Sequence, residues 1–282
     1  MIFQQIITGI IVGASYALIA LGLNLIWSIT DIPDFSQGGI YVIAAYVSYF
    51  AVTLARVPFF LALLAAMAVG SVISFILEKF LYKRWRGSGR IQLLCAIALF
   101  FLLSNGAILL WTPKAKIFPA YLQGGIPMFG FVLSFQRIVV LAVSTLLFII
   151  VFLFIQKTKM GKAIRAASQD REVAQVVGIN IDSVNSMVFI IGGALSSTAS
   201  VLISPLYAVF PAMGDLPLLK ALVVVILGGF GSVAGVLIGG LGLGLIESLG
   251  SVYLSAAYQH GFAFFVLLIA LMFFPKGLFG KV

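Results

Sequence analysis

Charged residues are scarce in this chain. Asp, Glu, Lys and Arg together make up 9% of its 282 residues, whereas 62% are hydrophobic and the mean hydropathy is +1.21. A soluble domain carries about 25% charged residues, which it needs to cover its surface. The scarcity therefore excludes an ordinary soluble enzyme, a disordered chain and a secreted disulfide scaffold. It predicts an integral membrane protein.

Residues that carry chemistry are scarce as well. The chain has a single cysteine, Cys95, and so can form no intrachain disulfide. Cys95 and the single histidine, His260, cannot by themselves build a tetrahedral zinc site. We therefore expect no metal. No Gly-x-x-x-x-Gly-Lys-Ser/Thr phosphate loop is present, so the chain alone is not expected to hydrolyse ATP. No nucleophile–base pair occurs at helical spacing, and we expect no enzymatic activity.

Long apolar runs dominate what is present. A membrane-crossing helix needs about 20 mostly apolar residues, and the alternating ten-residue strands of a membrane barrel are absent. The sequence therefore predicts an all-α, polytopic helical bundle in a single transmembrane domain, residues 1–282, with about 8–9 transmembrane helices. Eight segments are clear candidates and one, 216–227, is doubtful because it is short. The nine segments are 6–27, 38–55, 59–81, 91–111, 135–155, 184–209, 216–227, 233–251 and 262–274.

The basic residues are unevenly distributed. Twelve of the seventeen Lys and Arg residues fall in the regions 79–90 and 157–171 and in the C-terminal tail. By the positive-inside rule these three regions are cytoplasmic, and the net charge of +9 follows from topology rather than from binding nucleic acid. An even number of crossings is then required after 171, which makes 216–227 a crossing. The polar run 31–39 is either a full turn between two helices or a break inside one.

Residues 157–180 form the most informative polar segment. Alanines recur near helical spacing between charged residues, and Gly178 follows as a plausible helix stop. The segment predicts a short amphipathic helix on the cytoplasmic side, which is either a solvated connection or a docking element for lipid or protein. Alanine is small for a lipid-binding face and suits close docking into a protein groove.

Four blocks of sequence, in order along the chain, resemble the permease subunits of bacterial ABC importers, and specifically the LivH-type branched-chain amino-acid permease family. The most specific block is the segment 157–180, which is similar to the coupling segment of importers. The blocks are Gly13-Ala-Ser-Tyr-Ala-Leu-Ile-Ala-Leu-Gly22, Tyr82-Lys-Arg-Trp-Arg-Gly87, Gly161-x-Ala-x-Arg-Ala166 with Asp170, Ala174 and Gly178, and Leu219-Lys-Ala221 with Leu227-Gly-Gly-x-Gly-Ser232.

This resemblance implies a transport subunit of the bacterial cytoplasmic membrane. Its partners would be a second, LivM-like permease, two ATPase subunits that bind ATP and Mg, and a periplasmic binding protein. The residues expected to couple to the ATPase are Gly161, Arg165, Asp170, Glu172, Ala174 and Gly178. Branched-chain amino acids are the implied substrates; urea, short amides and aromatic carboxylates are alternatives, and a self-sufficient secondary transporter or channel is the competing class.

The chain departs from the family in one place. Members often carry Asn-Phe-Ala-His-Gly after the first helix, where this chain reads Asp34-Phe-Ser-Gln-Gly38. The departure leaves the expected fold unchanged and concerns the substrate, if this break lines the pathway.

Several polar side chains fall inside apolar segments, where an ionisable group costs about 2.5–3.5 kcal/mol. Glu247 is expected to face the bundle interior with a partner that the sequence does not identify. For Lys220 we expect snorkelling to the membrane interface. Interhelical hydrogen bonding is expected for the uncharged groups, with substrate contact as the alternative. The candidate pathway or interhelical residues are Gln37, Asn24, Asn105, Glu247 and Lys220.

Overall fold

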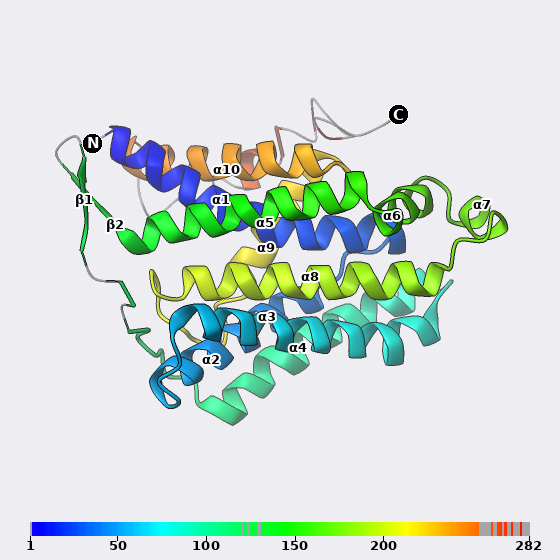
Figure 1. Ribbon diagram of the computed structural model, residues 1–282, viewed down its shortest axis with the longest axis horizontal. Helices are drawn as coiled ribbons and strands as arrows, with labels where there is room; N and C mark the ends of the chain where they lie inside the picture. The colour runs from blue at the N-terminus through cyan, green and yellow to red at the C-terminus, as the bar shows by residue number, and fades with distance from the viewer. Residues whose placement is uncertain are drawn as a thin grey trace.

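The computed structural model describes residues 2–119, 121–122, 124–128 and 131–253, and residues 261, 264–266, 268, 269, 272 and 277. Its helices lie side by side along the long axis of the molecule (Figure 1). Six helices in the described residues are long and apolar enough to cross a membrane, which confirms the predicted all-α membrane architecture. They are α1 (Ile2–Thr30), α3 (Phe59–Leu77), α4 (Gly89–Trp111), α5 (Phe135–Lys157), α8 (Ile181–Ile203) and α10 (Val233–Tyr253).

Two shorter helices pack among these six. Helix α2 (Ser36–Thr53) has 18 residues, and α9 (Asp215–Gly228) has 14. At 1.5 Å per residue α9 is about 21 Å long, less than the hydrocarbon core of about 30 Å. The segment expected at 216–227 is therefore a helix, but one that covers only part of the membrane. The segment expected at 262–274 lies largely outside the described residues.

Helix α1 forms the centre of the bundle, with most of its residues buried. Glycines allow its neighbours to approach at backbone distance. A Cβ on Gly13 would come within 2.6 Å of the Gly240 carbonyl oxygen of α10, and one on Gly22 within 3.0 Å of Gly192 of α8. Gly240 thus lets α10 pack closely against α1, as small residues do between membrane helices.

The polar run after α1 is a complete turn. Helix α1 ends at Thr30, Asp31 adopts a positive φ of 59°, and α2 begins at Ser36. Of the two alternatives that the sequence left open, the turn between two helices is correct.

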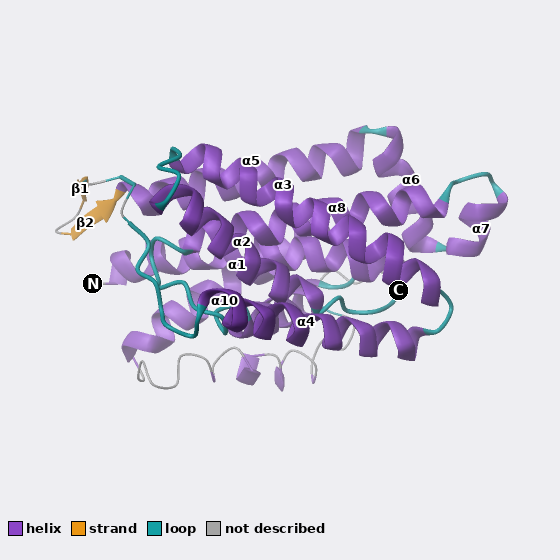
Figure 2. Ribbon diagram, turned by 90° about the horizontal axis from the view of Figure 1, so that it is seen from below, coloured by secondary structure: helices purple, strands orange, loops and turns teal. Residues whose placement is uncertain are grey.

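The two ends of the bundle differ in structure. At one end lies the hairpin of β1 (Gly125–Met128) and β2 (Phe131–Ser134), antiparallel and with Gly125 opposite Ser134. At the other lie α6 (Lys159–Gln169) and α7 (Arg171–Val176), as Figures 1 and 2 show. The second basic region is part of this end, which is the cytoplasmic end by the positive-inside rule.

Candidate functional site

The cytoplasmic segment folds as two helices instead of the single one expected. The break lies at Asp170, whose backbone is extended and whose carboxylate accepts a hydrogen bond of 2.9 Å from the Val173 amide. Thr158 caps α6 in the same way, accepting 2.9 Å from the Gly161 amide. A side chain that caps a helix N-terminus favours starting a new helix over continuing the old one. Asp170 therefore ends α6 and begins α7.

Helix α6 is held against the end of α5. Gly161, Ile164 and Ala167 form its buried face. A Cβ at Gly161 would lie 2.4 Å from the carbonyl oxygen of Ile155, so only glycine fits there. The Arg165 guanidinium donates to the same Ile155 carbonyl. These two expected coupling residues thus anchor the segment to α5.

Helix α7 presents apolar side chains to the solvent. Val173, Val176 and Val177 are 57%, 87% and 70% exposed, whereas Ala174 is 3% exposed and packs inward. The small side chain of Ala174 was expected to permit contact with a partner, and the structure instead buries it within the chain. Apolar side chains that remain exposed to water are unfavourable. An exposed apolar patch of this kind marks an interaction site.

The remaining expected coupling residues lie on the outside of this tip. Glu172 is exposed in the first turn of α7, where its charge favours the helix N-terminus. Gly178 has a positive φ of 88°, and no described heavy atom lies within 4 Å of a Cβ placed there. It ends the helix as expected, in a conformation that glycine adopts without strain.

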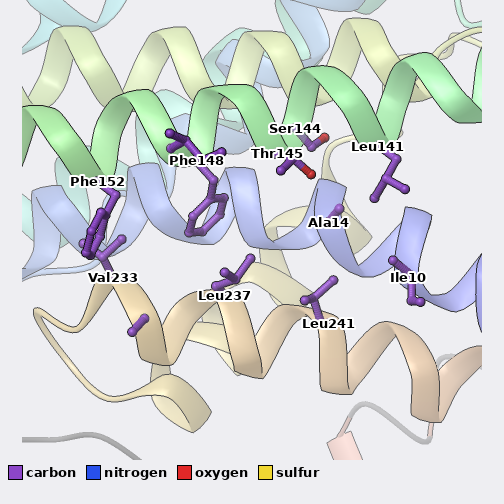
Figure 3. Close-up of a pocket in the computed structure, with 12 residues that line it drawn as sticks. Ile10, Ala14, Leu141, Ser144, Thr145, Phe148, Phe152, Val233, Leu237 and Leu241 are labelled. Carbon is purple, nitrogen blue, oxygen red and sulfur yellow. The ribbon is translucent and has the colours of Figure 1, made fainter.

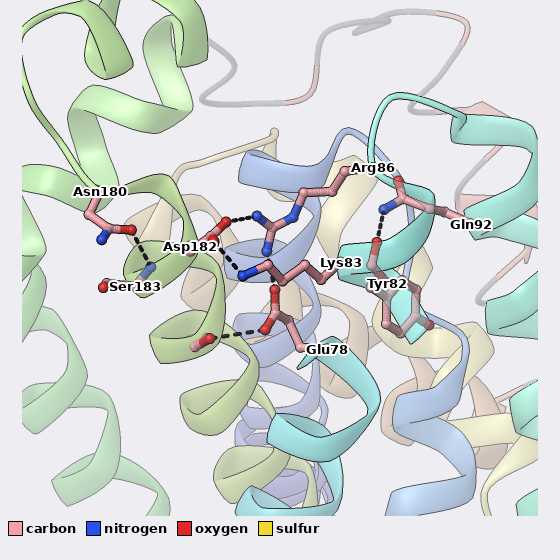
Figure 4. Close-up of polar contacts among 9 residues, drawn as sticks. Glu78, Tyr82, Lys83, Arg86, Gln92, Asn180, Asp182 and Ser183 are labelled. Atoms are coloured by element: carbon pink, nitrogen blue, oxygen red, sulfur yellow. Dashed lines mark hydrogen bonds and ion pairs between the residues drawn. The ribbon is translucent and has the colours of Figure 1, made fainter. Parts of the chain in front are cut away.

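A cluster of ion pairs joins the coupling segment to α3 (Figure 4). Arg86, which follows η2 (Lys83–Trp85), binds both Glu78 and Asp182. Lys83 also binds Asp182, at 2.6 Å, and the Ser186 hydroxyl donates to Glu78 at 2.9 Å. Asp182 lies in the first turn of α8, directly after the coupling segment. The cluster therefore ties the exit of that segment to η1 (Glu78–Tyr82), a π-helical turn that ends α3.

The first residue of α7 lies close to this cluster. Burial, followed by the nearby Arg86 charge, lowers the pKa of the Arg171 guanidinium, and Asp31 and Asp182 act in the opposite direction. From the sequence, the basic residues of the region 79–90 are interpreted as topology signals and as part of the family resemblance, and no ion pair is predicted for them. A pairing signal was present for Arg86, since Glu78 precedes it by eight residues, but the role of Asp182 depends on the tertiary fold.

A second polar network lies deeper, at the start of α2. The buried Asp34 carboxylate accepts 2.9 Å from the Gln37 side-chain amide and 2.5 Å from the Tyr82 hydroxyl. Gln37 in turn accepts 2.8 Å from the Ser196 hydroxyl of α8. Two of the residues that depart from the family pattern are thus hydrogen-bonded to each other inside the subunit. They join α2, the end of α3 and α8.

The charged pair of the membrane interior connects three helices. The Lys220 ammonium lies 2.8 Å from the Glu247 carboxylate and 2.7 Å from the Tyr16 hydroxyl. Lys220 is 3% exposed, so the snorkelling expected for it is wrong. Its partner Glu247 satisfies the charge in the interior, and sequence reasoning missed both this pairing and Tyr16. The Oε1 oxygen of Glu247 has no hydrogen-bond partner among the described residues.

The two asparagines differ in environment. Asn24 is fully buried and accepts 3.0 Å from the Gly231 amide, which positions the loop between α9 and α10. Asn105 is exposed on α4 and donates 2.8 Å to the Phe101 carbonyl of its own helix. Asn24 thus makes a contact between segments, whereas the hydrogen bond of Asn105 stays within α4.

An apolar groove of about 510 Å³ lies between α5, α1 and α10 (Figure 3). Its lining is aliphatic and aromatic except for Ser144 and Thr145. None of the described residues that line it is charged, so none could bind the ends of a zwitterion. The groove is therefore a poor candidate for a solute site.

A helical membrane bundle whose cytoplasmic end exposes apolar side chains fits a membrane transport subunit. Comparison with known proteins then gives the family. Residues 5–271 match the model of the "Branched-chain amino acid transport system / permease component" family, and the chain belongs to it.

Curated relatives match over nearly their whole length. The branched-chain amino acid permease protein BraD of Pseudomonas aeruginosa is 33% identical over 99% of this chain and 95% of its own. The LivH permease protein of Escherichia coli K12 is 32% identical over the same shares. A more distant relative, the ribose import permease protein RbsC of Haemophilus influenzae, is 25% identical over 91% of this chain and 80% of its own.

A solved structure supports the fold. PsaBC from Streptococcus pneumoniae superposes with a TM-score of 0.54 at 13% identity, covering 96% of this chain and 92% of that one. By its family and its curated relatives, the protein is a permease subunit of an ABC importer in the inner membrane, not an enzyme. Membership of this family implies ATPase and binding-protein partners.

Proposed function

We propose that the chain forms one half of a translocation pathway for branched-chain amino acids, beside a second permease of the LivM type. The binding protein delivers the amino acid to the outer face. Two ATPase subunits bind ATP and Mg, and their closure drives the permeases between outward- and inward-open states. The relatives named BraD and LivH support this choice of substrate over urea, short amides and aromatic carboxylates.

The observation that carries the proposal is the exposed tip of α7. Val173, Val176 and Val177 form the contact with an ATPase groove, while Glu172 and Gly178 flank it. Gly161, Arg165 and Asp170 act behind the contact, because they fix the position and the break of the segment. Ala174 serves the inner packing of α7 and not the contact itself.

The test uses Val176→Asp in the complete transporter, reconstituted in proteoliposomes with its ATPase subunits and binding protein. The introduced charge cannot be buried without a partner. We expect ATP-driven uptake of radiolabelled leucine to fall by more than about tenfold, a loss of about 1.4 kcal/mol or more in coupling.

The matched control is Val132→Asp, which places the same charge at a 68% exposed valine of the hairpin at the opposite end. It should leave co-purification of the ATPase unchanged. Leucine uptake by Val176→Asp at the wild-type rate would contradict the proposed contact. Uptake by the chain alone under an ion gradient, without ATP, would favour a secondary transporter instead.

A further inference from the structure

The segment between α8 and α9 has irregular backbone. Residues 204–214 form turns and one isolated bridge, in which Val209 pairs with Lys116. Helix α9 follows, and its far end at Gly228 packs on Gly235 in the first turn of α10. Helix α9 is about 21 Å long, which is less than the hydrocarbon thickness of about 30 Å. Measured from the far end of α9 at Gly228, its first residue, Asp215, therefore lies inside the hydrocarbon region.

Side-chain contacts agree with this depth. Lys220, five residues after Asp215, bonds to Tyr16 near the middle of the long helix α1. The backbone of Gly214 approaches Gly38 in the first turn of α2, because a Cβ on Gly214 would lie 2.3 Å from the Gly38 carbonyl oxygen. The start of α9 is therefore held among buried helices.

One face of this region is uncovered. Asp215 is exposed, and in the described part of the chain its carboxylate has no hydrogen bond or ion pair. The side chains around it in sequence are also exposed, at 57% for Tyr207, 38% for Phe210, 40% for Leu216 and 39% for Leu219. The Lys220 charge does not reach this face, since it is buried against Glu247.

A lipid-facing position does not fit these observations. Irregular backbone occurs at membrane depth only where protein buries it or where it lines a water-filled cavity. An unpaired carboxylate in hydrocarbon is costly, and such groups face cavities and mark substrate pathways. The irregular backbone is for the most part buried or half-buried within the protein, but the exposed, unpaired carboxylate of Asp215 requires water or a polar occupant at the start of α9.

We propose that this face lines the translocation pathway and that Asp215 binds the ammonium group of the amino-acid substrate, an inference that rests on the proposed function. A carboxylate and an ammonium group form a charge-assisted hydrogen bond, which is stronger than a neutral one. Leu216 and Leu219 supply an apolar surface beside it for a branched aliphatic side chain. The charge of Asp215 thus selects solutes with a positive group and disfavours carboxylate anions.

The first experiment asks whether the face is wet, and it does not depend on the substrate. In a Cys95→Ser background, Leu219→Cys is compared with Leu102→Cys, which is 66% exposed on the apolar helix α4. The complete transporter in proteoliposomes is treated with a membrane-impermeant cationic methanethiosulfonate. Because the thiolate is the reacting form and needs water, we expect Leu219→Cys to react at least about tenfold faster. Equally slow reaction at both positions overturns the proposal.

The second experiment asks what Asp215 binds. In the complete transporter, Asp215→Asn should lower ATP-driven leucine uptake at least about tenfold, as expected for loss of one charge-assisted hydrogen bond. Binding-protein-stimulated ATP hydrolysis should persist, and Asp215→Glu should restore most of the uptake. The control is Arg84→Gln, which removes an exposed charge at the cytoplasmic end and should leave uptake unchanged.

Leucine uptake by Asp215→Asn within about twofold of the wild type, less than half a kcal/mol, overturns the role of Asp215. Loss of both uptake and stimulated hydrolysis, without rescue by Asp215→Glu, also overturns it, since a structural role then explains the result. If the wild-type transporter shows no ATP-driven leucine uptake, the proposed substrate fails. The labelling ratio still decides independently whether the face is wet.

Discussion

The cytoplasmic end and the membrane interior of this permease use charge in opposite ways. At the cytoplasmic end, four charged residues share a partly exposed cluster around Arg86, and apolar valines point outward from α7. In the interior, one pair, Lys220 and Glu247, is almost completely buried among glycine-packed helices. Charges that water can reach are replaceable, whereas a buried charge is tolerated only together with its partner. This difference predicts a graded set of mutational effects.

The largest effect is expected when one member of the interior pair is removed. Lys220→Met leaves Glu247 buried and uncompensated, and breaking a buried pair costs about 3–5 kcal/mol. Thermal unfolding of the purified permease in detergent should show the loss. The double variant Lys220→Met with Glu247→Leu should recover most of it, because two apolar residues replace both charges. A double variant as unstable as the single one would contradict the account of the pair.

Backbone contact between α1 and α10 should be the next most sensitive feature. Gly13→Leu pushes a side chain against Gly240 and Leu241, where even a Cβ has no room. Overpacking of this kind costs about 1–3 kcal/mol or more. The control is Gly106→Leu on α4, where no described heavy atom lies within 4 Å of an added Cβ. Similar melting temperatures for the two variants would contradict this prediction, because they would show that α1 and α10 can move apart at no cost in stability.

The cytoplasmic cluster should respond less. Arg86→Gln leaves the buried Glu78 carboxylate with only the Ser186 hydroxyl, and an under-satisfied buried group costs about 1–3 kcal/mol. Arg84→Gln removes the same charge from the same loop at an exposed position, and should change stability little. Thermal unfolding of both variants tests this, and equal destabilisation would place the effect in loop charge and not in the cluster.

The smallest effect is expected at the exposed edge of the cluster. The Lys83 and Asp182 side chains are 50% and 49% exposed, so their ion pair is screened by solvent. Lys83→Gln should cost about 0–1 kcal/mol, and the cost should shrink further in high salt. If Lys83→Gln destabilised the protein as much as Lys220→Met, the proposed difference between exposed cytoplasmic charges and buried interior charges would be wrong.

The sequence predicted the parts of this fold that depend on composition and local pattern. Hydropathy predicted the membrane helices, and the basic loops predicted that the end where α6 and α7 lie is cytoplasmic. The cap at Asp170 could have been predicted because Asp is a preferred residue at a helix N-terminus, but the alanines around it favoured one continuous helix. The resemblance to the permease family could be recognised because its motifs are local blocks.

The features that could not be predicted from the sequence depend on contacts between distant segments. Lys220 and Glu247 are 27 residues apart, and Tyr16 joins them from the other end of the chain. Ala174 and Val176 are two positions apart in the same alanine-rich and valine-rich run, and only packing decides that the first is buried and the second exposed. The depth of Asp215 likewise follows from the shortness of α9 together with the position of its far end.

The central claim, that the exposed tip of α7 receives the ATPase, can be tested by site-directed cross-linking. In a Cys95→Ser background, Val176→Cys carrying a thiol-linked benzophenone is illuminated in the complete transporter, with Val132→Cys as the control. We predict that the adduct at position 176 contains the ATPase subunit, as identified by mass, and that the adduct at 132 does not. Absence of the ATPase from the adduct at position 176 in an intact complex would contradict the account.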